Sequence, residues 1–182
     1  HYWRMRTPSL LLLASAALLG GCATADLKLP LQTVPSVDLD RFMGRWNVIS
    51  HVPNILEKGK VATADVYTRR PDGRIDNIFV FRKGSIDAPE KSWKGVAWVI
   101  NPESNAEWKV RLFWPFTADY LILELDPDYA WAVVSNGDGG LVWVLAREAS
   151  LPENVYQPIL DRIHRRGLDV AKLEKVPQRL SP

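Results

Sequence analysis

The feature that most constrains this chain of 182 residues is a succession of eight short runs rich in Val, Ile, Trp, Phe and Tyr, separated by turn-forming residues. The separators include Pro71-Asp72-Gly73 and Asn136-Gly137, and no helical periodicity lies between the runs. Eight antiparallel strands can close into a barrel, which removes the unpaired edges of an open sheet. The predicted fold is therefore all-β, an eight-stranded up-and-down antiparallel barrel. Its predicted strands span residues 45–51, 63–69, 75–81, 91–100, 107–114, 120–126, 131–135 and 141–147.

A helical pattern follows the last predicted strand. Pro152 suits the first turn of a helix and Gly167 its end, while Pro158 is expected to kink the helix or delay its start. We expect this C-terminal helix to pack outside the barrel, and residues 173–177 to form a short strand at the barrel edge. The apolar residues spaced along one helical face are Val155, Ile159, Leu160 and Ile163.

The composition excludes some classes of protein. It is 47% hydrophobic and 24% charged, which is typical of a folded globular chain. The 23 basic and 21 acidic residues leave a formal net charge of +2, which is too balanced to indicate a nucleic-acid partner. The eight Trp indicate either a thick core or a lined cavity, because their side chains are large, flat and mostly apolar.

The N-terminal segment has the order of a secretory signal. Residues 1–4 are treated as an extension upstream of a start at Met5, which is followed by the basic Arg6, an apolar run over 10–19 and a small pair at 20–21. The run is shorter than the roughly 20 residues that cross a bilayer. It also lacks a polar face and helix caps. We therefore expect a cleaved export signal rather than a membrane span or a core helix.

Leu19-Gly20-Gly21-Cys22 resembles the bacterial lipobox, whose cysteine becomes the lipidated N-terminus after cleavage. The resemblance implies lipid attachment at Cys22, with a plain signal peptide and a free thiol as the alternative. In lipoproteins an Asp after the cysteine favours the inner membrane, whereas Ala23 here implies the outer membrane, facing the periplasm. The expected organisation is an extension and signal over 1–21, a lipidated tether over 22–37 and one domain over 38–182.

Three further motifs resemble the signature of the lipocalins. Gly44-Arg45-Trp46 opens the first predicted strand, Asp126-Pro127-Asp128-Tyr129 joins the sixth and seventh, and Arg147 ends the eighth. The likeness extends to bacterial lipocalins that carry a lipoprotein signal, and it covers about residues 38–177. The stretches that carry it are GRWNVISHVPN, RPDGRI, VRLFWPFTADYLIL, LDPDYAWAVV, LVWVLAR and NVYQPILDRIHRRGLDVAKL.

This resemblance implies structural rather than catalytic roles for the signature residues. Trp46 would cross the closed end of the barrel, with Arg147 against it in a cation–π pair worth roughly 1–2 kcal/mol when shielded. Gly44 would permit a close approach of the chain that a side chain would block. Asp126 and Tyr129 would belong to the turn between two strands.

The resemblance also implies a cavity for one hydrophobic ligand, such as a fatty acid or a lysophospholipid. Alternate strand residues point inward, so an inward Trp46 places Val48 and Ser50 inside as well. Asp65 shares this alternation with Tyr67, but a bulge that turns Asp65 to solvent is the favoured alternative. Residues nearest the closed end are expected to be core rather than ligand contacts. The residues assigned to the ligand-binding interior are Tyr67, Asn77, Phe79, Ala97, Val110, Leu112, Trp114, Tyr120, Ile122, Trp131 and Trp143.

Two segments are expected at the open end. Residues 52–60 are interpreted as a lid, in which Lys58 and Lys60 either meet an anionic head group or remain solvated. Residues 113–116, with the sequence FWPF, are interpreted as an aromatic hairpin that forms an apolar lip or a contact between two copies in a homodimer.

Catalysis has little support in the sequence. His51 and His164, the histidines beyond Cys22, are far apart and lack metal-ligand spacing, and no Gly-x-Ser-x-Gly motif occurs. One kind of lipocalin-fold enzyme uses a cavity cysteine, whereas Cys22 belongs to the N-terminus. We expect a non-enzymatic, membrane-anchored lipid carrier of the bacterial envelope, without cofactor or metal. The alternatives are an isomerase or lipid-modifying enzyme on the same barrel, and an envelope interaction protein with a packed barrel.

Overall fold

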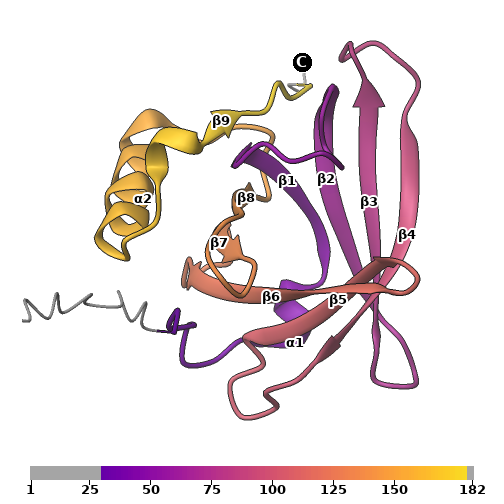
Figure 1. Ribbon diagram of the computed structural model, residues 1–182, viewed down its shortest axis with the longest axis vertical. Coiled ribbons are helices and arrows are strands. Elements are labelled where there is room, and N and C mark those ends of the chain that lie inside the picture. The colour runs from indigo at the N-terminus through magenta and orange to yellow at the C-terminus, as the bar shows by residue number, and fades with distance from the viewer. Residues whose placement is uncertain (1–29, 180–182) are drawn as a thin grey trace, which may run out of the picture.

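The computed structural model describes residues 30–179, in which eight antiparallel strands form a closed barrel and a helix covers part of its outer face (Figure 1). The predicted signal at 1–21, Cys22 and the first part of the tether lie outside the described residues. Within the described range, no helix has both the length and the apolar character needed to cross a membrane.

The strands follow one another up and down around the barrel. Each pairs with the next, and β1 pairs with both β2 and β8, which closes the ring. In the turn between β2 and β3, Gly73 has a φ of +82° and donates its N–H to Arg70 O at 3.0 Å, as the Pro-Asp-Gly sequence favours. The strands are β1 (Gly44–His51), β2 (Lys60–Arg69), β3 (Ile75–Lys83), β4 (Lys91–Val99), β5 (Glu107–Phe113), β6 (Phe116–Leu125), β7 (Trp131–Ser135) and β8 (Val142–Ala146).

Short elements flank the barrel at both ends of the described chain. Helix α1 (Leu39–Phe42) precedes β1, and Asp38 caps it. After β8 come α2 (Glu153–Arg165), a 3₁₀ turn at Val170–Lys172 and β9 (Glu174–Lys175). The predicted edge strand is confirmed, because β9 pairs with the end of β1.

Side chains of opposite strand faces build two separate cores. Inside the barrel, residues such as Ile122 and Val134 join an aromatic cluster around Trp46. Outside, their neighbours Leu123 and Val133 pack with the buried face of α2. Strands β6 to β8 are therefore apolar on both faces, since the helix covers the side that would otherwise meet water. The helix contributes Tyr156, Ile159 and Ile163 to this outer core.

The signature residues meet at the closed end. The guanidinium carbon of Arg147 lies 3.8 Å from the ring centroid of Trp46, which is fully buried. The same guanidinium donates to Arg45 O at 2.9 Å and to Arg41 O at 2.6 Å, while Trp46 Nε1 donates to Phe42 O at 2.8 Å. Arg147 therefore ties β8, α1 and the start of β1 together.

The remaining signature residues shape the backbone around this pair. Gly44 has a φ of +94°, and a Cβ there would lie 3.3 Å from Arg147 Nη1. Asp126 accepts the N–H of Ala130 at 3.2 Å within the β6–β7 turn, and the Tyr129 hydroxyl accepts the N–H of Asp38 at 2.8 Å. Their contacts are structural ones.

Two expectations about local structure are wrong, and one of the two alternatives for Pro158 is excluded. A register shift in β1 between Val48 and Ser50 turns Ser50 outward, where it accepts a hydrogen bond from the Tyr156 hydroxyl at 2.8 Å. Helix α2 begins at Glu153 and continues through Pro158, so this proline does not delay its start. Strand β6 begins at Phe116 rather than residue 120, because a tight turn follows Phe113.

Candidate functional site: the barrel cavity

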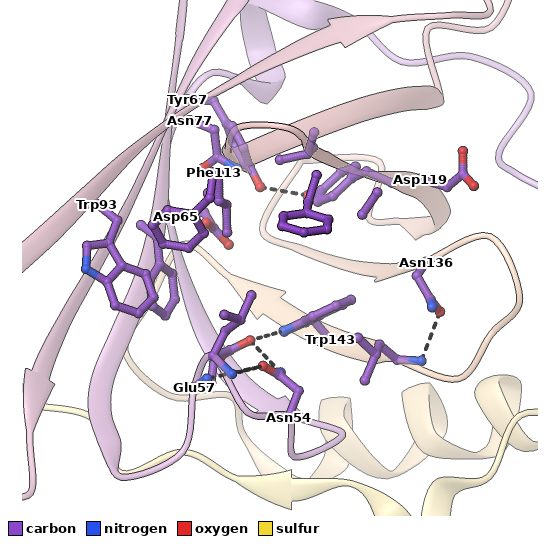
Figure 2. A pocket seen from close by; sticks show the side chains of 18 residues that line it. Asn54, Glu57, Asp65, Tyr67, Asn77, Trp93, Phe113, Asp119, Asn136 and Trp143 are labelled. Carbon is purple, nitrogen blue, oxygen red and sulfur yellow. Dashed lines mark hydrogen bonds between the residues drawn. The ribbon is translucent and has the colours of Figure 1, made fainter.

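The interior of the barrel opens into a cavity of about 260 Å³ at the end away from the Trp46–Arg147 pair. Its walls come from β2 to β6 and β8, and its rim from the β1–β2, β5–β6 and β7–β8 connections (Figure 2). Small-molecule sites usually measure roughly 300–1,000 Å³. The volume therefore suits a slender ligand such as one alkyl chain.

Most of the residues predicted to face the interior do so. Ala97 and Ile122 are fully buried in the inner core below the cavity, where we expected side chains near the closed end to be. The predicted residues that line the cavity itself are Tyr67, Asn77, Phe79, Val110, Leu112, Tyr120 and Trp143.

Two predicted interior tryptophans lie elsewhere. Trp131 belongs to the outer core and has the Arg162 guanidinium 5.0 Å from its ring centroid, because Ala132 and Val134 take the inward positions of β7. Trp114 is 83% exposed at the tip of the β5–β6 hairpin, beyond the last residue of β5. Assigning these two side chains to the interior is therefore wrong.

The floor of the cavity is aromatic and polar. The Tyr67 hydroxyl donates to the Tyr120 hydroxyl at 2.9 Å, and both rings pack on Trp108. Burial, together with the nearby charge of Asp65, raises the pKa of both tyrosines, so both remain neutral phenols. Asn77 is only 4% exposed, and its Oδ1 has no hydrogen-bond partner among the described residues.

Asp65 lies inside the barrel, so the expectation that a bulge turns it to solvent is wrong. Cross-strand pairing places it between Trp46 and Phe79 on one inward row. A bulge does occur in β2, but it ends at Ala64. Asp65 therefore lies on the same inward face of the strand as Tyr67. Burial, then the negative charge of Glu57, raises the pKa of Asp65 from 3.8 to about 8. Figure 2 shows its carboxylate among the cavity side chains.

The β1–β2 connection covers the opening through Glu57. This buried carboxylate accepts hydrogen bonds from Trp143 Nε1 at 2.7 Å and Asn54 Nδ2 at 3.0 Å, and its Oε2 lies 3.1 Å from His51 Nδ1. Burial alone would raise the pKa of Glu57, but His51 and the two donors outweigh it and lower the pKa. The predicted lid is thus fixed to β1 and β8 by one ionised side chain.

The two lid lysines occupy different environments. Lys58 is exposed, whereas the Lys60 ammonium donates to Leu56 O and lies 4.4 Å from the ring centroid of Trp93. Beside them the β5–β6 hairpin exposes Trp114 and Phe116, the latter by 78%. The mouth is therefore a rim of apolar and basic side chains.

Sequence reasoning missed several lining residues. Trp93 shares the alternation of Ala97, so the same parity argument would have found it. Glu57 and Asn54 had no comparable signal, because they lie in a loop whose path depends on tertiary contacts. Over residues 30–179, no group of three or more His, Cys, Asp or Glu side chains is placed to hold a metal ion.

Comparison with known proteins identifies the family. The family model described as a lipocalin-like domain matches residues 37–178. The chain belongs to the lipocalin family. This lipocalin is 29% identical to the outer membrane lipoprotein Blc of Escherichia coli over 96% of its own length and 98% of the relative. It is 30% identical to temperature-induced lipocalin-1 of Arabidopsis thaliana, over 85% and 87% of the two chains.

Solved structures agree on the fold. Lobster apocrustacyanin A1 superposes with a TM-score of 0.63 at 13% identity, covering 82% of this chain and 91% of the other. Insecticyanin from the tobacco hornworm Manduca sexta gives a TM-score of 0.63 at 15% identity, covering 82% and 85%. The recognition of a lipocalin barrel from the sequence is thus confirmed.

Proposed function

We propose that this lipocalin is a non-enzymatic carrier of single-chain amphiphilic lipids in the bacterial cell envelope. The observation that carries the proposal is the cavity, which is enclosed by aromatic and aliphatic walls and has polar groups at its floor and rim. Burying an alkyl chain there gains about 25 cal/mol per Å² of apolar surface removed from water. Membership of the lipocalin family supports a hydrophobic small molecule as the ligand.

The geometry of the mouth supports exchange of the ligand with a membrane. The side chains of Ile55, Trp114 and Phe116 are 84%, 83% and 78% exposed. Ile55 and Trp114 lie on connections at the open end, and Phe116 begins β6 there. Exposed aromatic side chains of this kind favour the boundary between water and lipid. We propose that they form the lip through which the lipid enters, and that Lys58 and Lys60 meet anionic groups there.

An envelope location is supported by the relatives and by the N-terminal sequence. The Escherichia coli relative is named an outer membrane lipoprotein. The proposal for this chain is lipid attachment at Cys22 after removal of residues 1–21, with residues 22–37 as tether and the lipocalin domain over 38–182. Fatty acids and lysophospholipids are the first ligands to test, since the resemblance to bacterial lipocalins suggested them.

Tryptophan fluorescence provides the test. Trp93 and Trp143 line the cavity, so a bound chain should shift or quench their emission. We expect saturable changes with fatty acids and lysophospholipids. Their dissociation constants should be micromolar, which corresponds to a binding free energy of about −8 kcal/mol. A chain with Leu112→Trp should lose binding, because the larger side chain fills the cavity. If no single-chain lipid of any head group changes the emission, the carrier function is refuted and a packed interaction domain is favoured.

A further inference from the structure

Asp65 is an acidic side chain without a counterion at the floor of the cavity. Its carboxylate has no hydrogen-bond or ion-pair partner within residues 30–179. The groups that face it are Trp46 of β1, Tyr67 of its own strand, Phe79 of β3 and Tyr120 of β6. Asp65 is only partly exposed, and a largely desolvated carboxylate without a partner is costly, since such groups are usually paired or neutralised.

A second acceptor lies beside it on the neighbouring strand. Asn77 pairs with Tyr67 in the β2–β3 register, two residues from Asp65, and its buried Oδ1 also lacks a partner. The Tyr67 hydroxyl is committed to the Tyr120 hydroxyl. The floor therefore offers the carboxylate oxygens and an amide oxygen, which suit a ligand group rich in donors.

The charge of the whole lining favours a cation. Among the described residues that line the cavity none is Lys, Arg or His, whereas Glu57, Asp65 and Asp119 are acidic. Glu57 Oε1 accepts from Trp143 and Asn54, and its Oε2 lies 3.1 Å from His51 Nδ1. Asp119 is paired with Lys109 at 2.5 Å and points away from the cavity (Figure 2). The basic groups Lys58 and Lys60 lie at the rim, where Lys60 packs over Trp93. An anionic head group at the floor would thus meet the unpaired Asn77 Oδ1 and, once Asp65 ionises, a negative charge.

We propose that the floor of the cavity is a subsite for the ammonium group of a long-chain amine, with Asp65 as its counterion and Asn77 Oδ1 as a second acceptor. The proposal rests on the carrier function above and specifies its ligand class and orientation, head group inward. The three donors of a primary ammonium match the acceptors available. The alkyl chain then runs past Phe79 and Trp93 toward the lip.

This arrangement has a pH signature of its own. Near pH 7 the Asp65 carboxyl of the empty cavity is mostly protonated, since its pKa is about 8. An alkylammonium keeps its proton until about pH 10, like the side chain of Lys. Binding of the amine therefore releases a proton from Asp65 at pH 7, and affinity rises between pH 6 and pH 8.5. Glu57, the other acid near Asp65, stays ionised throughout this range because its pKa is lowered.

The test compares three twelve-carbon probes that differ only in their head groups: dodecylamine, dodecanol and dodecanoate, each used below its aggregation concentration. Tryptophan fluorescence and titration calorimetry on the full chain at pH 6, 7.5 and 8.5 give the affinities. We expect dodecylamine to bind at least about tenfold more tightly than dodecanoate at pH 8.5. Calorimetry at pH 7 in two buffers of different ionisation enthalpy should detect proton release with dodecylamine.

Two isosteric variants assign the effect to Asp65. Asp65→Asn should weaken dodecylamine about tenfold or more and change dodecanol by less than about threefold. Asp76→Asn, which removes a half-exposed acid of β3 that does not line the cavity, should leave all three affinities unchanged. Three outcomes would each overturn the amine subsite while leaving the carrier function intact. They are dodecanoate binding as tightly as dodecylamine, the absence of proton release, and an unchanged dodecylamine affinity in Asp65→Asn. Failure of all three probes to bind would instead overturn the carrier function.

Discussion

The carboxyl group of Asp65 ionises less readily in the folded chain than in the unfolded one, because burial raises its pKa from 3.8 to about 8. A group whose pKa is raised on folding binds more protons in the folded state. The free energy of unfolding therefore falls as pH rises from about 4 to about 8, and then levels off. Asp65 thus destabilises the empty barrel, and the effect is largest at alkaline pH.

Asp65→Asn should remove this pH-dependent cost. The variant should be more stable than the parent by roughly 1–3 kcal/mol at pH 8.5 and about equally stable at pH 4.5. Urea unfolding of both proteins at the two pH values measures the difference. As a control, Asp119→Asn removes a partly exposed ion pair and should destabilise the chain by at most about 1 kcal/mol at either pH. A stability gain at pH 4.5 as large as that at pH 8.5 would contradict a charged, buried Asp65.

At the scale of strands and loops, the sequence predicted the elements better than the faces of their side chains. Turn residues set the order of all eight barrel strands, and alternation placed Tyr67, Phe79 and Tyr120 correctly in the interior. Alternation failed at Ser50 and Trp131. In β1 an inserted residue shifts the register. In β7 both faces are apolar because α2 covers the outer one, so hydrophobicity could not distinguish inside from outside.

The lid had even less signal in the sequence, and its attachment can be tested. Glu57 holds the β1–β2 connection against Trp143, so Glu57→Ala would leave the indole N–H of Trp143 and the amide of Asn54 without their acceptor. We expect the loop to open more often and bound dodecanol to dissociate several-fold faster, with a smaller change in association rate. Stopped-flow tryptophan fluorescence measures both rates.

Lys58 provides the matched control for this loop. Its side chain is exposed next to Glu57, so Lys58→Ala should leave the dissociation rate of dodecanol within about twofold of the parent, as is usual for surface substitutions. Equal dissociation rates for Glu57→Ala and the parent would show that Glu57 does not hold the lid closed.

At the scale of the whole molecule, the described part of the tether is bound to the barrel. Arg166 donates to Gln32 O at 3.0 Å, and the N–H of Val34 donates to Ile122 O at 2.9 Å. Leu31 also packs against the outer core, so residues 23–30 separate Cys22 from the docked segment, and these eight residues span at most roughly 30 Å. An acylated Cys22 would therefore keep the barrel within a short distance of the bilayer, where the exposed side chains of the lip can reach lipid.

Anchorage and lipid binding should consequently be separable. Cys22→Ser removes the acylation site, so we expect the protein to move from the membrane fraction to the soluble periplasmic fraction, because the few exposed apolar side chains of the lip do not replace acyl chains as an anchor. Its affinity for dodecanol should stay within about twofold of the parent, since the cavity lies wholly within residues 54–143. Ala23→Asp is the matched control: it keeps the cysteine and should redirect the protein to the inner membrane. Fractionation with immunoblotting follows all three chains. Persistent membrane association of Cys22→Ser would mean that the barrel itself binds the bilayer, and the lipobox would then no longer account for localisation.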